Sequence, residues 1–228
     1  MFNLDVKKIP LSEKNKFIWL KQMNIKTVFD IGANIGQFAK QIHNTLPDAN
    51  IYSFEPLKDC FEQLQKTMGG INNSKVFNFA LGDEVNETFI YKNEYSTSSS
   101  LLEMQELHKE AFPYTAQATK EKISIKRLDD AVNEFTLELK EPILIKMDVQ
   151  GYEDKVIAGA LSVISRAKLI ITEVSFWELY KNQKLFGDIY QLLIGLGFKY
   201  KGSLEQIMNP VDGRPLQADA LFIKEDNR

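Results

Sequence analysis

The sequence predicts an α/β fold, in which a doubly wound and mostly parallel sheet forms a single domain. Short apolar runs typical of strands alternate with segments whose apolar residues recur at helical spacing. The connections are short and contain Pro, Gly and Asn, an order typical of parallel strands joined by crossover helices. The chain has 228 residues, 44% of them apolar and 26% charged, which is enough for one sizeable core.

The first part of the chain shows this alternation most clearly. A helix is expected over residues 11–23, with Ser12 as its N-cap and Phe17, Leu20 and Met23 on its inner side. The order expected after it is strand 27–31, helix 36–46, strand 50–56, helix 58–68 and strand 75–82.

Residues 83–140 interrupt this alternation. We expect strand 87–95, a polar loop and helix over 96–112, and a strand with a short helix over 123–132. We interpret the chain as one domain spanning 1–228, with an N-terminal helical segment over 1–25. Residues 83–140 are interpreted as an insertion in this domain. The ligand-facing edge of an open sheet is where such insertions usually select the substrate. The alternation resumes with strand 142–147, helix 155–167, strand 168–176, a helix within 186–202 and strand 218–225.

Composition excludes several classes of protein. The net charge of −3 indicates no overall basic surface for nucleic acid. Cys60 is the only cysteine, so an intramolecular disulfide is impossible and a cysteine-based zinc site is disfavoured; a buried apolar role is expected for it. No apolar run approaches the roughly 18 residues of a membrane span, and "MFNLDVKKIP" lacks the apolar core of a signal peptide. A soluble cytoplasmic protein with no membrane partner is expected.

The stretch "VFDIGANIGQF", residues 28–38, joins a strand to a helix through two glycines. Gly32 and Gly36 would allow a sharp turn and close approach of the backbone to a ligand beyond the strand end, where Asp30 lies. The loop is Gly-x-Asn-x-Gly and lacks the G-x-G-x-x-G spacing that cradles a pyrophosphate, which disfavours a nicotinamide-dependent oxidoreductase. Taken alone, the loop could also be a tight turn without a ligand.

Glu55 ends the second strand in "YSFEP", 19 residues after Gly36. An acidic residue at this place accepts hydrogen bonds from two ribose hydroxyls. The alternative is an exposed glutamate before a helix. The combination with the glycine loop favours a cofactor site.

These and further motifs resemble the FkbM-type methyltransferases, which use S-adenosylmethionine. The resemblance covers residues 26–224 and also rests on "NFALGD", "STSSSL", "KRLDD", "IKMDVQGYE", "LIITEVSF", "LLIGLGF" and "ADALFIK". It implies a Rossmann-like class I methyltransferase fold, with a seven-stranded sheet, an antiparallel last strand and the insertion before strand 4.

The resemblance also implies roles for individual residues. It places Asp148 at the junction of methyl donor and acceptor, and it assigns Gly82 and Asp83 to a closing turn. The remaining cofactor contacts that it implies are the first loop (Asp30, Gly32, Asn34, Gly36), the ribose anchor Glu55, and the two sides of the adenine slot (Pro56 and Leu57; Asn78, Ala80 and Leu81).

Methyl transfer is an in-line displacement, so it requires alignment and, for a hydroxyl acceptor, removal of a proton. Asp148 is the first candidate for a catalytic residue, with Glu153 and Glu173 as partners. Converging carboxylates could instead hold Mg²⁺. Gln150 stands where the family most often has glutamate, which disfavours a metal, and no metal ligand is assigned.

Other residues have both a functional and a structural interpretation. His108 is an alternative general base. Residues 96–100, all Ser or Thr, form either a flexible polar loop or a contact to substrate or cofactor. Trp177 and Tyr180 could stack on a sugar ring, but packing against the sheet is favoured.

The function that follows is O-methylation of a hydroxyl on a sugar or on a glycosylated or polyketide-like small molecule, without a nucleic-acid partner. A nucleic-acid methyltransferase would be expected to have a basic stripe, or an Asn/Asp-Pro-Pro-Tyr/Phe motif where this chain has "DVQGYE". A non-catalytic scaffold that retains the cofactor site is the other alternative.

Overall fold

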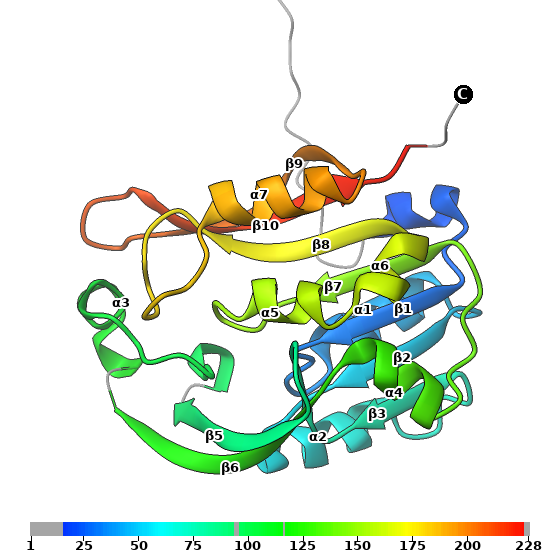
Figure 1. The fold of residues 1–228 in the computed structure, drawn as a ribbon, viewed down its shortest axis with the longest axis horizontal. Helices are drawn as coiled ribbons and strands as arrows, with labels where there is room; N and C mark the ends of the chain where they lie inside the picture. The colour runs from blue at the N-terminus through cyan, green and yellow to red at the C-terminus, as the bar shows by residue number, and fades with distance from the viewer. Residues whose placement is uncertain (1–15, 94–95, 116, 226–228) are drawn as a thin grey trace, which may run out of the picture.

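The computed structural model describes residues 16–93, 96–115 and 117–225, and within them it confirms the predicted fold class (Figure 1). The described residues form a seven-stranded sheet with the order β3-β2-β1-β7-β8-β10-β9. Its first five strands pair in parallel, and β10, the last strand in the chain, pairs antiparallel with both neighbours. The strands are β1 (Thr27–Ile31), β2 (Asn50–Phe54), β3 (Ser74–Phe77), β7 (Ile143–Met147), β8 (Ala167–Ser175), β9 (Lys199–Met208) and β10 (Pro215–Ile223).

The strand order reverses between β1 and β7. The chain runs outward from β1 to β2 and β3 on one side, then returns to place β7 against the other side of β1. At the carboxyl ends, Ile31 stands in register with Phe54 of β2 and Met147 of β7. Open α/β sheets bind ligands at this position, because the loops that follow the strands diverge there and leave a crevice.

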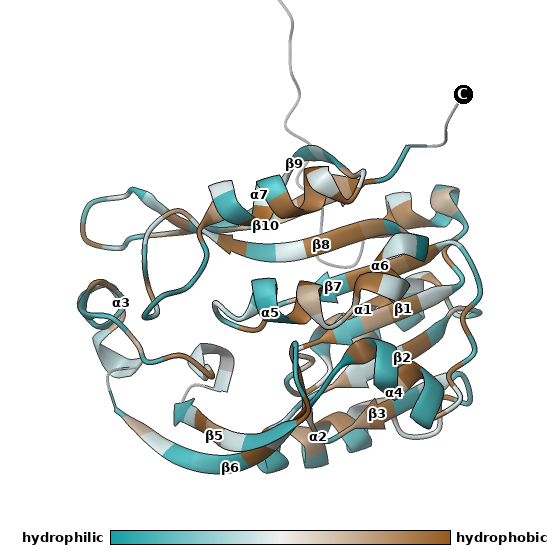
Figure 2. Ribbon diagram, in the orientation of Figure 1, coloured by the Kyte–Doolittle hydropathy of each residue, from teal (hydrophilic) through white to brown (hydrophobic). Residues whose placement is uncertain are grey.

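Helices cover both faces of the sheet (Figure 1), and its central strands bury apolar side chains on both faces, seen as brown stretches along β8 in Figure 2. One face packs α4, α5, α6 and α7 around a core that includes Phe29, Phe54 and Ile145. The other face packs α1, α2 and a short 3₁₀ helix around Val28, Ile51 and other residues. The helices are α1 (Gln37–Thr45), α2 (Lys58–Met68), α4 (Leu128–Glu134), α5 (Glu153–Ala158), α6 (Leu161–Arg166) and α7 (Phe186–Gly195).

The described part of the predicted N-terminal helix is of another type than expected. Within its described part the chain forms a 3₁₀ helix, Ile18–Met23, which ends where Asn24 adopts the left-handed conformation. Phe17 and Leu20 are buried as expected, whereas Ser12 lies outside the described residues.

Two predicted elements are each split by the tertiary structure. The strand expected at 75–82 ends at Phe77, and its last residues form β4 (Ala80–Leu81) in a second sheet. The helix expected at 155–167 breaks at Gly159, where a Cβ atom would lie 1.8 Å from the carbonyl oxygen of Gly82. Only a helix was expected within 186–202, but α7 ends at Gly195 and β9 begins at Lys199.

The predicted insertion forms a second sheet beside the carboxyl ends of the main one. Strands β5 (Asn86–Asn93) and β6 (Ala118–Lys126) pair antiparallel, β4 pairs with β6, and α3 (Glu106–Ala111) lies between β5 and β6 in the chain. In Figure 1 this ribbon and α3 lie at the left, beyond the ends of β7 and β8. Helix α4 departs from this arrangement, because Leu128 and Ala131 are buried in the main core.

Residues 96–105 connect the second sheet to the loop that follows β8. On one side the backbone N–H of Tyr91 in β5 donates to the carbonyl of Ser100 (2.8 Å), and on the other Gln105 N–H donates to Leu179 (2.8 Å). The segment therefore runs across the ligand-facing edge. No helix in the described parts of the chain is both long and apolar enough to span a bilayer.

Candidate active site

A cavity of about 240 Å³ lies where β1, β2 and β7 end. Its walls come from the loops after these three strands, from β4 and from the segment 96–101. Residues predicted from separate motifs, including Asn34, Glu55 and Asp148, therefore line one continuous space.

The loop after β1 is held against both neighbouring strands. Gly32 and Ala33 each donate a backbone hydrogen bond to the carbonyl of Phe54 (3.0 Å). Gly32 has a φ of +78°, and a Cβ atom on it would lie 1.9 Å from the carbonyl oxygen of Asp148, so only glycine fits. Gly36 lies away from the cavity lining; it begins α1, where a Cβ atom would meet Leu64 of α2 at 2.9 Å.

Glu55 is buried at the end of β2 and lines the cavity, as predicted. Its Oε2 accepts a hydrogen bond from the backbone N–H of Asn34 and its Oε1 accepts one from Leu57, both at 2.9 Å. Burial raises the pKa of Glu55 to about 7 despite these bonds. A carboxylate oxygen has two acceptor sites, so each retains capacity for a ligand hydroxyl.

The predicted adenine slot divides into lining and supporting residues. Pro56, Leu57, Ala80 and Leu81 line the cavity. Asn78 lies outside the lining, and its side-chain amide donates to the backbone carbonyls of Glu55 (3.0 Å) and Pro56 (2.9 Å). It thereby fixes the loop that carries the ribose-anchor candidate. In the predicted closing turn, Gly82 packs against Ile125 and Tyr152, and Asp83 pairs with Lys155 at 2.9 Å.

Asp30, predicted as a cofactor contact, is fully buried and lies outside the cavity lining, and neither carboxylate oxygen has a hydrogen-bond partner among the described residues. Burial raises its pKa to about 6, against the lowering effect of Lys146. Lys146, which the motif analysis missed, lines the cavity, and its Nζ lies 3.0 Å from Asp148 Oδ2. A lone lysine in the apolar strand "ILIKM" was the available signal, because burial of such a charge requires a partner.

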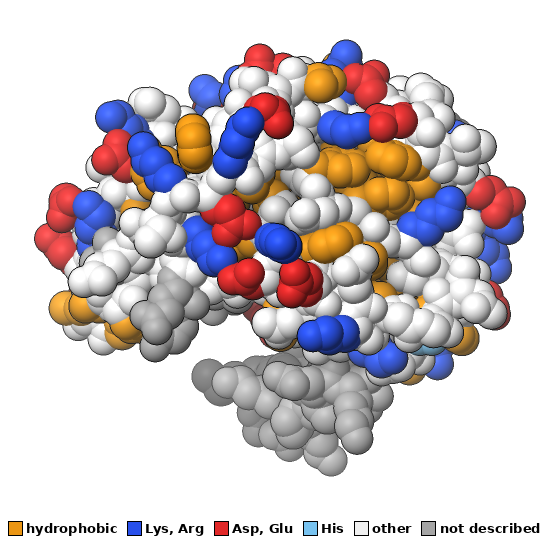
Figure 3. All heavy atoms as spheres, turned by 90° about the horizontal axis from the view of Figure 1, so that it is seen from below, with side chains coloured by type: hydrophobic (Ala, Val, Ile, Leu, Met, Phe, Trp, Pro, Cys, Tyr) orange, Lys and Arg blue, Asp and Glu red, His pale blue; other side chains and the backbone are white. Residues whose placement is uncertain are grey.

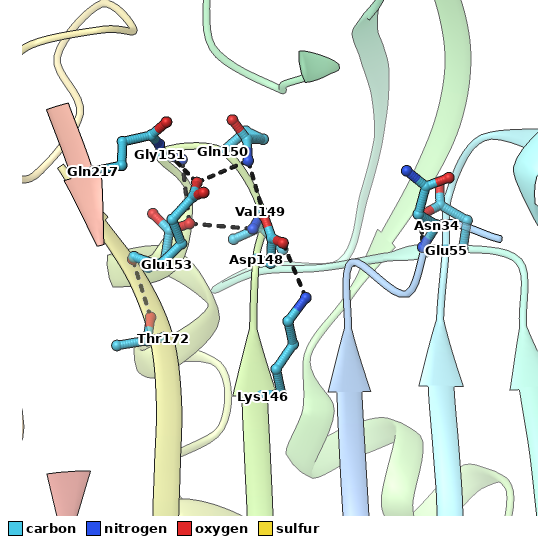
Figure 4. A network of polar contacts seen from close by, with 11 residues as sticks. Asn34, Glu55, Lys146, Asp148, Val149, Gln150, Gly151, Glu153, Thr172 and Gln217 are labelled. Atoms are coloured by element: carbon cyan, nitrogen blue, oxygen red, sulfur yellow. Dashed lines mark hydrogen bonds and ion pairs between the residues drawn. The ribbon is translucent and has the colours of Figure 1, made fainter. Parts of the chain in front are cut away.

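The three predicted catalytic carboxylates lie near one another but in different environments; Figure 4 shows Asp148 and Glu153, and the amide of Gln150 joins Asp148 to Glu173. Asp148 alone among them lines the cavity. Glu153 Oε1 accepts backbone hydrogen bonds from Val149 (3.2 Å) and Gly151 (3.3 Å), and burial raises its pKa to about 7. Glu173 is also buried, and burial together with the negative charges of Asp148 and Glu153 raises its pKa well above the usual range.

Gln150 lies between two of these carboxylates. Its Nε2 donates to Asp148 Oδ1 and to Glu173 Oε2, both at 2.8 Å, and its Oε1 accepts from the hydroxyl of Tyr180 at 2.9 Å. Tyr180 is fully buried, in agreement with the packing role favoured for it. Trp177 is 43% exposed and donates to the carbonyl of Pro215 at 3.1 Å.

The serine segment contacts the cavity, whereas His108 does not. Ser96, Ser99 and Ser100 line the cavity, and Ser96 Oγ donates to Asn34 Oδ1 at 3.1 Å. His108 is buried on α3, and burial lowers its pKa to about 4, so it is neutral at pH 7. It contacts the Thr115 and Tyr180 hydroxyls.

Comparisons with known proteins agree with this geometry. Residues 30–200 match the model of the "Methyltransferase FkbM domain" family. The chain is 29% identical to the 2-O-methyltransferase NoeI of Sinorhizobium fredii (strain NBRC 101917 / NGR234) over 173 residues, which are 73% of this chain and 70% of that protein.

Solved structures share the fold at low identity. A methyltransferase FkbM from Methylobacillus flagellatus KT superposes with a TM-score of 0.52 at 14% identity, over 88% of this chain. The chain spans only 44% of that protein's length. An rRNA methylase from Streptococcus thermophilus superposes with a TM-score of 0.50 at 10% identity, over 96% of this chain and 99% of that one.

Proposed function

Since the chain belongs to the FkbM methyltransferase domain family and is an S-adenosylmethionine-dependent methyltransferase, we propose that it methylates a hydroxyl oxygen. The proposed acceptor is a sugar or a glycosylated or polyketide-like small molecule. The observation that carries the proposal is the single cavity that joins Asn34, Glu55 and Asp148.

The residues around this cavity fit the cofactor. Glu55 offers a buried carboxylate to ribose hydroxyls, and Leu57, Ala80 and Leu81 offer an apolar surface to an adenine ring. Asp30, fully buried and outside the cavity lining, adds a carboxylate behind the loop that would contact the cationic amino-acid moiety. S-adenosylmethionine supplies an activated methyl group when bound.

Asp148 is proposed to orient the acceptor hydroxyl and to receive its proton. It lines the cavity at the end of β7, and Lys146 and Gln150 hold its two oxygens in a defined direction. Glu153 and Glu173 are proposed as its partners: the first holds the loop 149–151 and the second holds the amide of Gln150. One relative is named as a 2-O-methyltransferase, which supports oxygen as the acceptor atom.

A small-molecule or carbohydrate acceptor is proposed in preference to nucleic acid. The net charge is −3, and on the face shown in Figure 3 acidic and basic side chains are interspersed. On the β5–β6 ribbon, Lys92 pairs with Glu121 and Lys122 pairs with Glu87. Such pairing leaves little net positive charge for phosphates. The proposal includes no divalent cation, because the amide of Gln150 lies between the carboxylates of Asp148 and Glu173.

Calorimetric titration with S-adenosylhomocysteine, with NAD⁺ as a parallel ligand, tests the cofactor site. Wild type should bind S-adenosylhomocysteine only, and Glu55→Ala should bind it about 10- to 100-fold more weakly, since hydrogen bonds to a charged group are lost. Glu62→Ala, on the exposed side of α2, is the matched control and should bind like wild type. Absence of binding to wild type would refute the site, and binding of NAD⁺ instead would identify an oxidoreductase.

Methyl transfer itself is tested by an acceptor screen. Tritiated S-adenosylmethionine incubated with monosaccharides, glycosylated small molecules and single-stranded RNA distinguishes the proposed acceptors from nucleic acid. Label appearing only in RNA would overturn the small-molecule assignment. Binding of the cofactor without transfer to any acceptor would favour the non-catalytic alternative.

A further inference from the structure

Gln150 adopts a backbone conformation that few residues of its kind occupy. Its φ is +52°, and Gly151 follows with a φ of +97°. A left-handed residue without glycine's freedom persists only where its surroundings hold it. Here Ser100 Oγ donates to the carbonyl of Gln150 at 2.7 Å, and Glu153 Oε1 accepts the N–H groups of Val149 and Gly151 on either side.

The direction of the Gln150 amide is determined by its neighbours. Its Nε2 donates to Asp148 Oδ1 and to Glu173 Oε2, so both amide hydrogens are in use. The hydroxyl of Tyr180 donates to Oε1 at the other side. Every polar atom of this side chain is therefore engaged, and in a flipped amide Nε2 would no longer donate to Asp148 and Glu173.

Tyr180 is itself held by the segment that the sequence marks as an insertion. Its ring packs with Ala111, Leu179 and Leu216, and its hydroxyl lies 3.4 Å from Nε2 of His108 on α3. Because His108 is buried and neutral, it contributes position and not charge. A continuous series of contacts thus leads from α3 through Tyr180 and Gln150 to Asp148.

We propose that Gln150 is a positioning residue whose amide, oriented by Tyr180, takes the place of a divalent cation between Asp148 and Glu173. This inference rests on the proposed function, since Asp148 is the carboxylate that faces the cofactor cavity. The amide hydrogens join the two carboxylates, because one carboxylate oxygen of each lies 2.8 Å from Nε2. Lys146 completes the arrangement on the second oxygen of Asp148, so methyl transfer needs no metal.

Replacing the amide with a carboxylate should create a metal site. In Gln150→Glu, a third carboxylate would stand at hydrogen-bond distance from Asp148 and Glu173, an oxygen set that Mn²⁺ and Mg²⁺ bind and that repels itself without them. Gln217→Glu is the matched control, because Gln217 Nε2 also donates to Glu173 Oε2, at 2.7 Å, but makes no hydrogen bond to Asp148.

The first experiment is calorimetric titration of the full chain with Mn²⁺, with thermal melting in Mn²⁺ as a readout of folding. Gln150→Glu should bind Mn²⁺ at least tenfold more tightly than wild type and Gln217→Glu, and only its melting temperature should rise with Mn²⁺. The inference would be overturned if wild type bound Mn²⁺ as tightly as Gln150→Glu. It would also be overturned if the Mn²⁺ affinity of Gln150→Glu did not exceed that of wild type, whether or not the variant was purified in Mn²⁺. S-adenosylhomocysteine titrated into the same samples separates the two proposals: no binding to wild type refutes the cofactor site, whereas intact binding with unchanged Mn²⁺ affinity refutes only the role of Gln150.

A second measurement does not depend on the folding of a variant at position 150. In ¹H–¹⁵N spectra of wild type, the side-chain NH₂ of Gln150 should give two separated, slowly exchanging signals, because both hydrogens bond to carboxylates. Tyr180→Phe should move both signals and speed their exchange, while Tyr190→Phe, on α7, should leave them unchanged. A solvent-like NH₂ pair for Gln150 in wild type, or signals unaffected by Tyr180→Phe, would contradict the proposed orientation.

Discussion

Glu153→Gln separates a structural role of this residue from a catalytic one. Glu153 is the first residue of α5, it is 4% exposed, and its Oε1 accepts two backbone hydrogen bonds from the loop that carries Gln150. Glutamine keeps that acceptor oxygen in a side chain of nearly the same shape. It differs in being unable to ionise.

The expected difference in stability between Glu153→Gln and wild type follows from the pKa of Glu153, which burial raises from 4.5 to about 7. Between these pH values the folded state keeps a proton on Glu153 that the unfolded state has released. The contribution of Glu153 to the free energy of unfolding is therefore highest below pH 4.5 and falls as the pH rises to about 7. This difference in pKa corresponds to about 3 kcal/mol, or roughly 6–12 °C in melting temperature for a chain of this size. Glu153→Gln lacks this loss, so it should match wild type near pH 4.5 and exceed its stability by about that amount at pH 8.

Guanidinium unfolding of both proteins at several pH values between 4.5 and 8 measures the difference in unfolding free energy. Asp30 and Glu55 also titrate in this range, but they are common to both proteins and cancel in the difference. A difference that stays constant with pH would refute the reasoning. Loss of more than about 100-fold in kcat, with S-adenosylhomocysteine affinity unchanged, would instead assign Glu153 as a general base.

Two further predictions concern the loops around the cavity. Gly32→Ala should abolish S-adenosylhomocysteine binding and lower the melting temperature, because its Cβ atom would lie 1.9 Å from the carbonyl oxygen of Asp148; Gly187→Ala, in α7 with open space around it, should instead stabilise the chain by about 0.5–1 kcal/mol. A melting temperature of Gly32→Ala equal to that of wild type would show that the two loops can separate. Lys146→Met should cost about 1.5–3 kcal/mol at pH 8 and less at pH 5, since Asp30, whose pKa burial raises to about 6, loses a nearby cation but is protonated in acid. Equal costs at both pH values, measured by denaturant unfolding, would contradict the pairing.

The periodicity of the sequence was sufficient for the fold class and for most elements of the main sheet. Strand 27–31 and helix 58–68 were predicted with their observed bounds, because each combines a clear apolar period with turn residues at its ends. The errors fell where distant contacts outweigh local pattern. Gly159 breaks a helix because the backbone of Gly82 passes close to it, and residues 80–81 leave the predicted strand because β6 offers them a partner.

The candidate site divides in the same way. Glycine spacing and the carboxylate after the second strand pointed to Gly32 and Glu55, and the family resemblance added Asp148. All three line the cavity, because parallel strands place their carboxyl ends at one edge. Only the tertiary structure decided that Asp30, Gly36 and Asn78 lie outside the cavity lining, and that Lys146 belongs to it. The roles of Gln150 and Tyr180 also required it, since their hydrogen bonds join residues 23 to 30 positions apart that no local pattern relates.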